Sequence, residues 1–258
     1  MLFRNVRPRA LFVIALVAAA AVAAERLMPQ GGGTVEAAAE RAVLAISWQP
    51  AFCETRSRVP ECRSQRRGRI DTRQFSLHGL WPQPRRQTYC GVDRTVRSAA
   101  RGGWRNLPGL GLSRDLQRRL ADAMPGVRSY LHRHEWVKHG TCYRPSDGPR
   151  TAANYYEDSL ALLDEVNASA VANLFRSNIG RSLSSTRIRE AFDEAFGSGA
   201  GRRVRIECRR DGDRQIIVEL QIALQGRFGV EPMASLIRSA RPVRAGCPGG
   251  VVDPVGLQ

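Results

Sequence analysis

The sequence lacks any apolar run beyond residue 24 that approaches the roughly 20 residues of a membrane span. It also lacks an internal repeat and a linker that would divide it, so its 258 residues are expected to form one domain. Apolar residues are not scarce, however, because the chain is 43% hydrophobic and 25% charged. This composition supports a packed core and excludes a disordered chain.

Acidic residues are in the minority, with 24 Asp and Glu against 40 Lys and Arg, and the formal net charge is +16. Such a charge argues against a cationic substrate and favours a polyanion: a nucleic acid, an acidic polysaccharide or an anionic membrane surface. Lysine itself is nearly absent, since Lys138 is the only one beside 39 arginines. Either a compact ammonium is needed there rather than a planar guanidinium, or the single lysine falls there by chance.

Residues 1–24 have the pattern of a secretory signal peptide. Three arginines form a basic start, residues 11–20 are an unbroken apolar run, and small residues follow as far as Ala24. An uncleaved anchor is the alternative, but the run is short for a membrane span. Cleavage after Ala24 leaves 37 basic and 24 acidic residues, so the mature chain keeps a charge of +13. Residues 25–41 are expected to be a flexible lead-in, and the protein is expected to be periplasmic or secreted.

Six cysteines occur, and no two form a Cys-x-x-Cys pair, which argues against zinc ribbons and thioredoxin-type redox sites. In an oxidising compartment, an even number of cysteines favours structural disulfides. Six cysteines allow many pairings, and spacing alone prefers only that of Cys53 with Cys62. The others are Cys90, Cys142, Cys208 and Cys247.

Hydrophobic periodicity predicts an α+β fold, with helices in the middle of the chain and strands at both ends. Strands are predicted at 43–48, 75–78, 204–208 and 216–224. Helices are predicted at 132–138 and after the capping residues Ser113, Thr151 and Ser185. The Arg-rich stretch 54–73 and the Gly- and Pro-rich stretch 82–111 are expected to be mostly loop.

Three of the four histidines lie within eight residues, in a segment that contains His134, Glu135, Lys138 and His139. The segment partly resembles the zinc-protease pattern His-Glu-x-x-His, whose two ligands lie four residues apart on one helix face. Here the residue four after His134 is Lys138, a cation that repels a metal, so a zinc site is not expected. Two other pairs have that spacing, Glu135 with His139 and His134 with Lys138, and one cleft can contain all four. This set suits acid–base work on an anion such as a phosphate.

The fourth histidine lies in the segment from Phe75 to Pro82, at the end of a predicted strand. Gly79 after His78 is expected to leave room for a ligand to approach the backbone, and Trp81 offers a flat surface on which a base can stack. The alternative is that His78 is structural and that Trp81 belongs to the core.

These two segments, FSLHGLWP at 75–82 and HEWVKHGTC at 134–142, resemble the two active-site signatures of the ribonuclease T2 family of secreted acid endoribonucleases. Residues 47–53, SWQPAFC, are similar to the family's opening strand and first cysteine. The resemblance runs from about residue 43 to 247 and becomes diffuse in its later part. It implies one α+β catalytic domain over 42–258, with a central antiparallel sheet flanked by helices and stabilised by disulfides.

The resemblance implies metal-free cleavage of single-stranded RNA, in which the 2′-hydroxyl attacks the adjacent phosphorus. The product is a 2′,3′-cyclic phosphate, which is then hydrolysed more slowly to a 3′-phosphate. It implies that His139 is the base and His78 the acid, that Glu135 and Lys138 stabilise the pentacovalent phosphorane, and that His134 binds the phosphate. No metal or cofactor is expected, and we expect a monomer without membrane contact after signal cleavage.

By the same resemblance, Trp81 stacks the base at the cleavage site, Tyr89 is a second stacking aromatic, and His132 has no catalytic role. Two alternatives are an inactive relative that only binds RNA through its charge and a zinc hydrolase. The arginine excess has two interpretations as well, since it either tracks RNA across the surface or only keeps the protein soluble and reflects genomic composition. Base preference does not follow from the sequence. The implied disulfides are Cys53–Cys62, Cys90–Cys142 and Cys208–Cys247.

Overall fold

Strand β1 begins at Glu40, two residues before the domain start predicted from the sequence. The computed structural model describes residues 39–257, and all of them belong to one compact unit. The predicted signal peptide at 1–24 and nearly all of the predicted lead-in at 25–41 lie outside the described residues, so both stay predictions.

One mixed sheet contains the strands, in the order β2–β1–β5–β6–β3, and β4 also pairs with β5. β1 is antiparallel to β2 and β5, and β4 is antiparallel to β5, whereas β5 and β6 run parallel through Ile216 and Val251. The predicted α+β class is therefore confirmed, although the sheet is not antiparallel throughout. The strands are β1 (Glu40–Trp48), β2 (Phe75–Pro82), β3 (Ser182–Ser184), β4 (Val204–Asp211), β5 (Arg214–Gly226) and β6 (Gly249–Val251).

Helices fill much of the chain between the strands, and hydroxyl side chains cap several of them. Ser113 accepts a hydrogen bond from the Leu116 N–H at 3.2 Å, as predicted for the start of α5. Helix α9 starts one residue earlier than predicted, because Ser184 rather than Ser185 caps it. None of the described helices is long and apolar enough to cross a membrane. The helices are α2 (Gln49–Thr55), α3 (Pro60–Arg63), α4 (Arg94–Gly102), α5 (Arg114–Ala123), α6 (Leu131–Lys138), α7 (Ala152–Asn167), α8 (Ala170–Ser177), α9 (Ser185–Phe196) and α10 (Met233–Ser239).

Helix α4 lies inside the stretch 82–111, so the prediction of loop is wrong there. Asp93 caps the helix by accepting a hydrogen bond from the Thr95 N–H at 2.7 Å. The Gly and Pro residues of the stretch lie at or beyond the ends of α4, so their number concealed a short helix between them. The other predicted loop, at 54–73, likewise contains α3. Apolar side chains recur on the inner face of α4, at Val96, Ala99 and Ala100.

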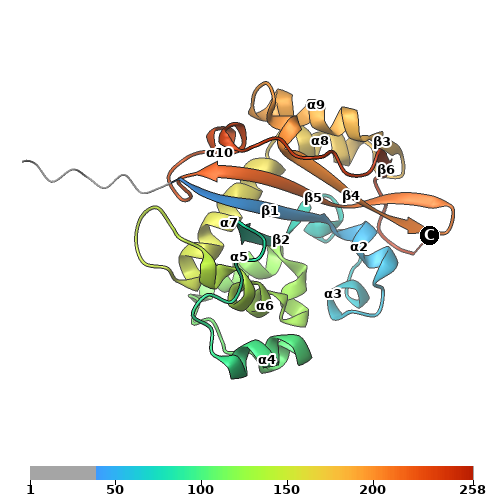
Figure 1. Ribbon diagram of the computed structural model, residues 1–258. Coiled ribbons are helices and arrows are strands. Elements are labelled where there is room, and N and C mark those ends of the chain that lie inside the picture. Colours follow the sequence, from blue (N-terminus) through green and yellow to red (C-terminus); the bar gives the residue numbers. More distant parts are fainter. Residues whose placement is uncertain (1–38, 258) are drawn as a thin grey trace, which may run out of the picture. The chain divides into compact units, whose positions relative to one another are not determined.

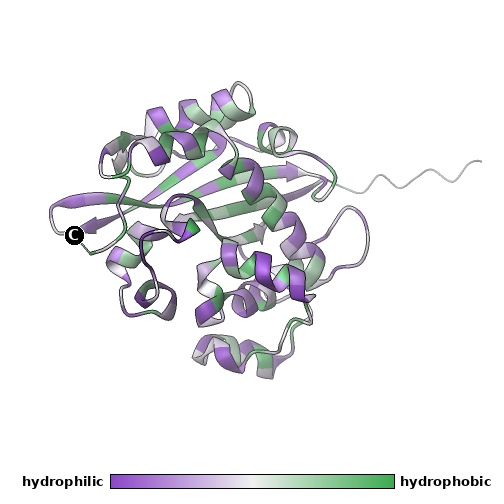
Figure 2. Ribbon diagram, turned by 180° about the vertical axis from the view of Figure 1, so that it is seen from behind, coloured by the Kyte–Doolittle hydropathy of each residue, from purple (hydrophilic) through white to green (hydrophobic). Residues whose placement is uncertain are grey.

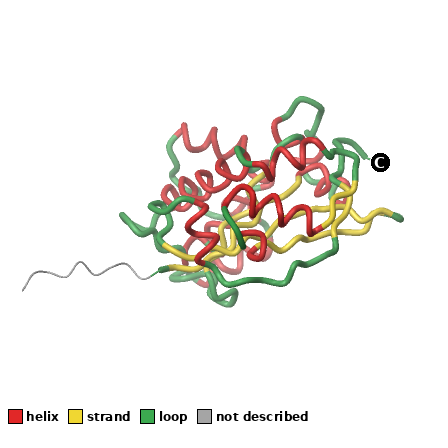
Figure 3. The backbone as a smooth tube through the Cα atoms, turned by 90° about the horizontal axis from the view of Figure 1, so that it is seen from above, coloured by secondary structure: helices red, strands yellow, loops and turns green. Residues whose placement is uncertain are grey.

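The central strands are buried on both faces. In β1, Leu44, Ile46 and Trp48 alternate as predicted, yet Ala45 between them is equally buried. Figure 1 shows the reason, because α8 and α9 lie on one side of the strands and α4, α5 and α6 on the other. Figure 2 shows that hydrophobic residues are concentrated along these strands. In Figure 3, the turn between β4 and β5 projects beyond the helices. The core therefore fixes β1, β2 and β5 rigidly beside one another.

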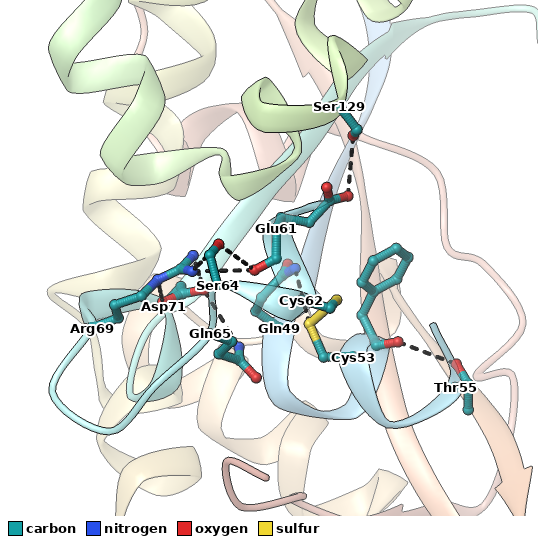
Figure 4. The surroundings of a disulfide bond; sticks show 11 residues. Gln49, Cys53, Thr55, Glu61, Cys62, Ser64, Gln65, Arg69, Asp71 and Ser129 are labelled. Carbon is teal, nitrogen blue, oxygen red and sulfur yellow. Dashed lines mark hydrogen bonds and ion pairs between the residues drawn. A yellow bond between two sulfur atoms is a disulfide. The ribbon is translucent and has the colours of Figure 1, made fainter. Parts of the chain in front are cut away.

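Three disulfides have the pairing implied by the resemblance: Cys53–Cys62, Cys90–Cys142 and Cys208–Cys247. The first joins α2 to α3, and Figure 4 shows its surroundings. Beside it, Arg69 donates to the backbone oxygen of Glu61 at 3.1 Å and to the Asp71 carboxylate at 2.8 Å. The cross-link and this arginine together order an otherwise polar segment.

Gly79 of β2 lies directly against the Glu135 side chain of α6. A Cβ atom at this position would overlap the Glu135 carboxylate and lie 2.8 Å from the Trp81 indole nitrogen. We predicted that Gly79 leaves room for a ligand, and that prediction is wrong, because the buried carboxylate fills the space. Glycine is needed here so that α6 can approach β2 closely.

Gly79→Ala is therefore expected to destabilise the protein by about 1–3 kcal/mol, the usual effect of overpacking a close contact. Thermal unfolding measures the change. Gly109→Ala is the matched control, because a Cβ atom there has no neighbour within 4 Å. Equal melting temperatures for the two variants would contradict the close packing of Gly79.

Candidate active site

His78 lies at a β-bulge in β2. Ala45 of β1 pairs with Gly79 and Ile46 pairs with Leu77, so His78 has no partner of its own on β1. A bulge inserts one extra residue and redirects its side chain, which is common beside active sites. The His78 side chain remains 33% exposed in a strand that is otherwise mostly buried.

Two carboxylates flank the His78 imidazole. Its Nδ1 lies 2.6 Å from Oε2 of Glu219 in β5, and its Nε2 lies 3.9 Å from Oε1 of Glu135 in α6. Burial lowers the pKa of His78, but the hydrogen bond to Glu219 and the charges of Glu135 and Glu219 outweigh burial and the opposing charge of Lys138. The net effect raises the pKa above its usual 6.5, so the imidazolium form is favoured.

Glu219 was missed in the sequence, although it is the closest polar contact of His78. It lies 141 residues further along the chain, and only the pairing of β1 with β2 and β5 brings the two together. The Gln221 amide donates to its other carboxylate oxygen at 2.8 Å, which fixes the Glu219 side chain. Glu207 of β4 lies opposite Glu219 in the ladder and forms an ion pair with Arg205. The available signal was one acidic residue inside an apolar strand.

Glu135 is only 3% exposed and accepts a hydrogen bond from the Trp81 indole N–H at 2.8 Å. Burial, with a smaller contribution from the charge of Glu219, raises the pKa of Glu135 above its usual value and outweighs the opposing effects of His78, the Trp81 hydrogen bond and Lys138. Its contacts place it between β2 and α6, beside the His78 ring. The structure therefore brings the two sequence segments together through this carboxylate.

His139 follows the last residue of α6, and its backbone N–H donates to the Glu135 carbonyl at 2.9 Å. Its ring is 9% exposed and lies 5.6 Å from the Trp81 ring, which also contacts His78 at 5.2 Å between centroids. Burial, followed by the nearby charges of Lys138 and other cationic groups, lowers the pKa of His139 to about 3. One histidine of this site thus favours the charged form and the other the neutral form.

His134 and Lys138 have different surroundings from Glu135. The His134 ring stacks on Trp104 with centroids 4.7 Å apart, a contact that the sequence did not indicate. Burial, with Lys138 second, lowers the pKa of His134 to about 4. The Lys138 charge lowers the pKa of all three neighbouring histidines, so its ammonium group lies within electrostatic reach of each.

Tyr89 reaches the site through its backbone, because its N–H donates to the Lys138 carbonyl at 2.8 Å. The backbone of Tyr89 is left-handed, with φ of 57°, and the next residue is Cys90 of the Cys90–Cys142 disulfide. Its ring lies under the guanidinium of Arg97 at 4.8 Å. One ring face is therefore covered by a cation, and a stacking role for Tyr89 stays a prediction.

A cavity of about 510 Å³ adjoins His78 and Glu219. Trp104 and Glu61 are among its other lining residues. Glu61 is 4% exposed and accepts a hydrogen bond from Ser129 Oγ at 3.1 Å, as Figure 4 shows. The cavity is large enough for a planar ring beside the acidic flank of His78.

Within residues 39–257, no group of three or more His, Cys, Asp or Glu has the arrangement of a metal site. His134 and His139 instead have separate aromatic partners, Trp104 and Trp81. The arrangement offers a protonated imidazole, a neutral imidazole, a carboxylate and an ammonium, which together suit proton transfer on a phosphate ester.

Comparison with known proteins places this chain in a family. The Ribonuclease T2 family model matches residues 40–232. Ribonuclease I of Escherichia coli (strain K12) is 28% identical over 208 residues, which are 72% of this chain and 75% of that protein. Ribonuclease T2-A of Mus musculus is 28% identical over 143 residues, 53% of this chain and 46% of the mouse protein, so this match spans less than half of the relative.

Solved structures share the fold. Human RNase T2 superposes with a TM-score of 0.54 at 20% identity, covering 83% of this chain and 98% of the human one. Japanese pear S3-RNase gives a TM-score of 0.53 at 17% identity, covering 82% and 98%. Together with the matched family model, these findings establish that the chain belongs to the ribonuclease T2 family, as a T2-type endoribonuclease for which the family implies an RNA substrate.

Proposed function

We propose that this enzyme cleaves single-stranded RNA without a metal, by attack of the 2′-hydroxyl on the adjacent phosphorus. The observation that carries the proposal is the opposite pKa shift of two histidines that both contact Trp81. A neutral His139 accepts a proton, and a protonated His78 donates one. In-line displacement needs both at once, and each positioned proton transfer contributes roughly 10²–10⁴-fold to the rate.

In the first step, His139 takes the proton of the 2′-hydroxyl as its oxygen bonds to phosphorus. The bond from phosphorus to the 5′-oxygen breaks, and His78 protonates that leaving oxygen. The products are a 2′,3′-cyclic phosphate and a free 5′-hydroxyl. In the slower second step, water replaces the 5′-hydroxyl and the histidines exchange roles, which gives a 3′-phosphate. DNA lacks the 2′-hydroxyl, so it can bind but cannot react.

In this proposal Lys138 stabilises the negative charge of the pentacovalent phosphorane directly, and Glu135 contributes to its stabilisation through the protonated His78 that it flanks. His134 is proposed to bind a phosphate oxygen, as the family resemblance implies, although one of its ring nitrogens is hydrogen-bonded to the Ala100 backbone in this structure. Trp81 supports the base beside the 2′-hydroxyl, and the cavity next to His78 and Glu219 receives the nucleotide whose 5′-oxygen leaves. Export to the periplasm or the medium is supported by the three disulfides, which persist in oxidising compartments.

The mechanism is tested first by product analysis. The mature, oxidised protein is incubated with single-stranded RNA in excess EDTA near neutral pH, and fragments ending in 2′,3′-cyclic or 3′-phosphate are expected. His78→Ala and His139→Ala are each expected to lower the rate by about 10²-fold or more, because each removes one proton transfer. Binding without cleavage would favour an RNA-binding relative, and cleavage only after zinc is restored would favour a zinc hydrolase.

The pH dependence of the activity is expected to follow from the opposite pKa shifts of His139 and His78. The base works only above its pKa, so activity is expected to rise through the range near pH 3, where His139 loses its proton. The acid works only below its pKa, so activity is expected to fall at a pH above 6.5, where His78 loses its proton. The profile of kcat/KM against pH measures both limits in the free enzyme. A profile that rises through pH 6.5 would reverse the assignment of the two histidines.

We also propose that Glu219 positions His78 and keeps it protonated. Glu219→Gln retains an acceptor for the Nδ1 proton but removes the charge. The alkaline limb of the profile is expected to move down by roughly one pH unit, since a hydrogen bond to a charged group contributes about 1.5–3 kcal/mol. Glu207→Gln is the matched control, because that carboxylate lies opposite Glu219 and pairs with Arg205. An unmoved alkaline limb in Glu219→Gln would leave the residue only a structural role.

A further inference from the structure

The segment from 85 to 114 contains seven arginines and a single acidic residue, Asp93. Its middle part forms α4 and the short turn Trp104–Asn106, and Figure 1 shows α4 at the outer edge of the helical side. The side chain of Asp93 is used to cap α4. The arginines of this segment therefore have almost no local charge to neutralise them.

Three of these arginines share one face of α4. Arg94, Arg97 and Arg101 are three and four residues apart, the spacing of neighbours on one helix face, and all three are exposed. Across the described residues 39–257, none of the three forms an ion pair, whereas exposed Arg118 pairs with Asp115 at 3.0 Å. Arg187 on α9 also has a carboxylate partner, Glu190. The outer face of α4 is thus a row of unneutralised guanidinium groups.

The inner face of α4 packs against α6, the helix that carries several residues of the site. Ala100 packs with Leu107 and with Val137 of α6, in a small apolar cluster separate from the main core. Both flanks of the helix also contact site residues. Before it, the Tyr89 N–H donates to the Lys138 carbonyl, and after it Trp104 stacks on His134. The row of arginines is therefore held against the helix that carries the site residues.

We propose that this outer face of α4 is a second phosphate-binding surface, which holds the RNA strand outside the two nucleotides at the cut bond. Guanidinium groups bind phosphate oxygens through paired hydrogen bonds and stay charged at any working pH. Arg94 and Arg101 are separated by about 10 Å along the helix, a length that spans more than one phosphate. The binding surface itself follows from charge and placement, and its role with a cleavable substrate rests on the proposed function.

An anionic membrane is the other polyanion that such a row would attract. A helix that lies on a membrane buries apolar side chains in the interface. The apolar residues of α4, which include Val96 and Ala99, face the protein instead. The outer face offers charge without apolar contact, which favours a nucleic-acid strand.

The test compares two double variants, Arg94→Gln/Arg101→Gln and Arg241→Gln/Arg244→Gln. Glutamine keeps the helix propensity of α4. Arg241 and Arg244 are equally exposed, lie between α10 and β6, and form no ion pair among the described residues. Arg97 is left intact, because it covers the Tyr89 ring. Kd is measured for a 2′-O-methyl RNA dodecamer, which lacks the nucleophile, and kcat/KM for a dinucleotide, which is too short to reach α4.

The α4 variant is expected to bind the dodecamer on the order of tenfold more weakly. Its log Kd against log salt is expected to be shallower by about 1.4, since each single-strand phosphate contact contributes about 0.7. Its dinucleotide kcat/KM and the dodecamer Kd of the control variant are expected to stay within about twofold of the parent.

Four results would overturn the proposal. Equal losses in both double variants would mean that the charge acts diffusely, and no loss in either would remove the arginines from RNA binding. Loss of dinucleotide cleavage in the α4 variant would mean that the helix only supports the site. Loss of binding to phosphatidylglycerol vesicles with an unchanged dodecamer Kd would assign the surface to membranes. If the parent binds the dodecamer but cuts no RNA, the proposed function fails, while the comparison of Kd values still decides this inference.

Discussion

The site depends on a carboxylate that is buried between a strand and a helix. An ionised group in such a place is costly unless it is hydrogen-bonded and faces opposite charge. Glu135 has both, through the Trp81 indole and the His78 imidazole. It also requires Gly79 beneath it, because any side chain there would overlap the carboxylate. One charge thus fixes how closely α6 approaches β2 and which residues of the two segments meet.

His78 and His139 have the same side chain, but their neighbours favour opposite protonation states of the two rings. His139 is buried among cationic groups, so its neutral form is favoured. His78 is only partly buried, and two carboxylates outweigh the effect of that burial on its pKa. One of them, Glu219, comes from a strand in the last fifth of the chain. The long β5 strand therefore contributes more than core packing, because it supplies one of the two carboxylates that raise the pKa of His78.

Features set by local sequence could be predicted, and features set by long-range pairing could not. The cap at Ser113 depends only on nearby atoms, and so does the presence of His134 to His139 at the end of one helix. The contact of His78 with Glu219 depends on strand order and on a bulge, neither of which alternation of apolar residues reveals. The α4 helix was missed for a different reason, since its capping Asp93 and short apolar stripe were hidden among glycines and prolines. The disulfides were implied by family resemblance, because spacing alone prefers only the first.

The site needs negative charge to keep His78 protonated, but it must also bind a negatively charged RNA strand. The carboxylates that keep His78 protonated also repel the phosphates of the substrate. Glu135 and Glu219 are close to the ring, so their effect is short-ranged and strong. Cations must then attract the strand from further away, where they do not lower the pKa of the acid. Lys138 is close enough to lower that pKa, whereas the arginines of α4 are not among the groups that act on His78. A basic surface set apart from an acidic catalytic pocket allows one molecule to hold a polyanion and still protonate its leaving group.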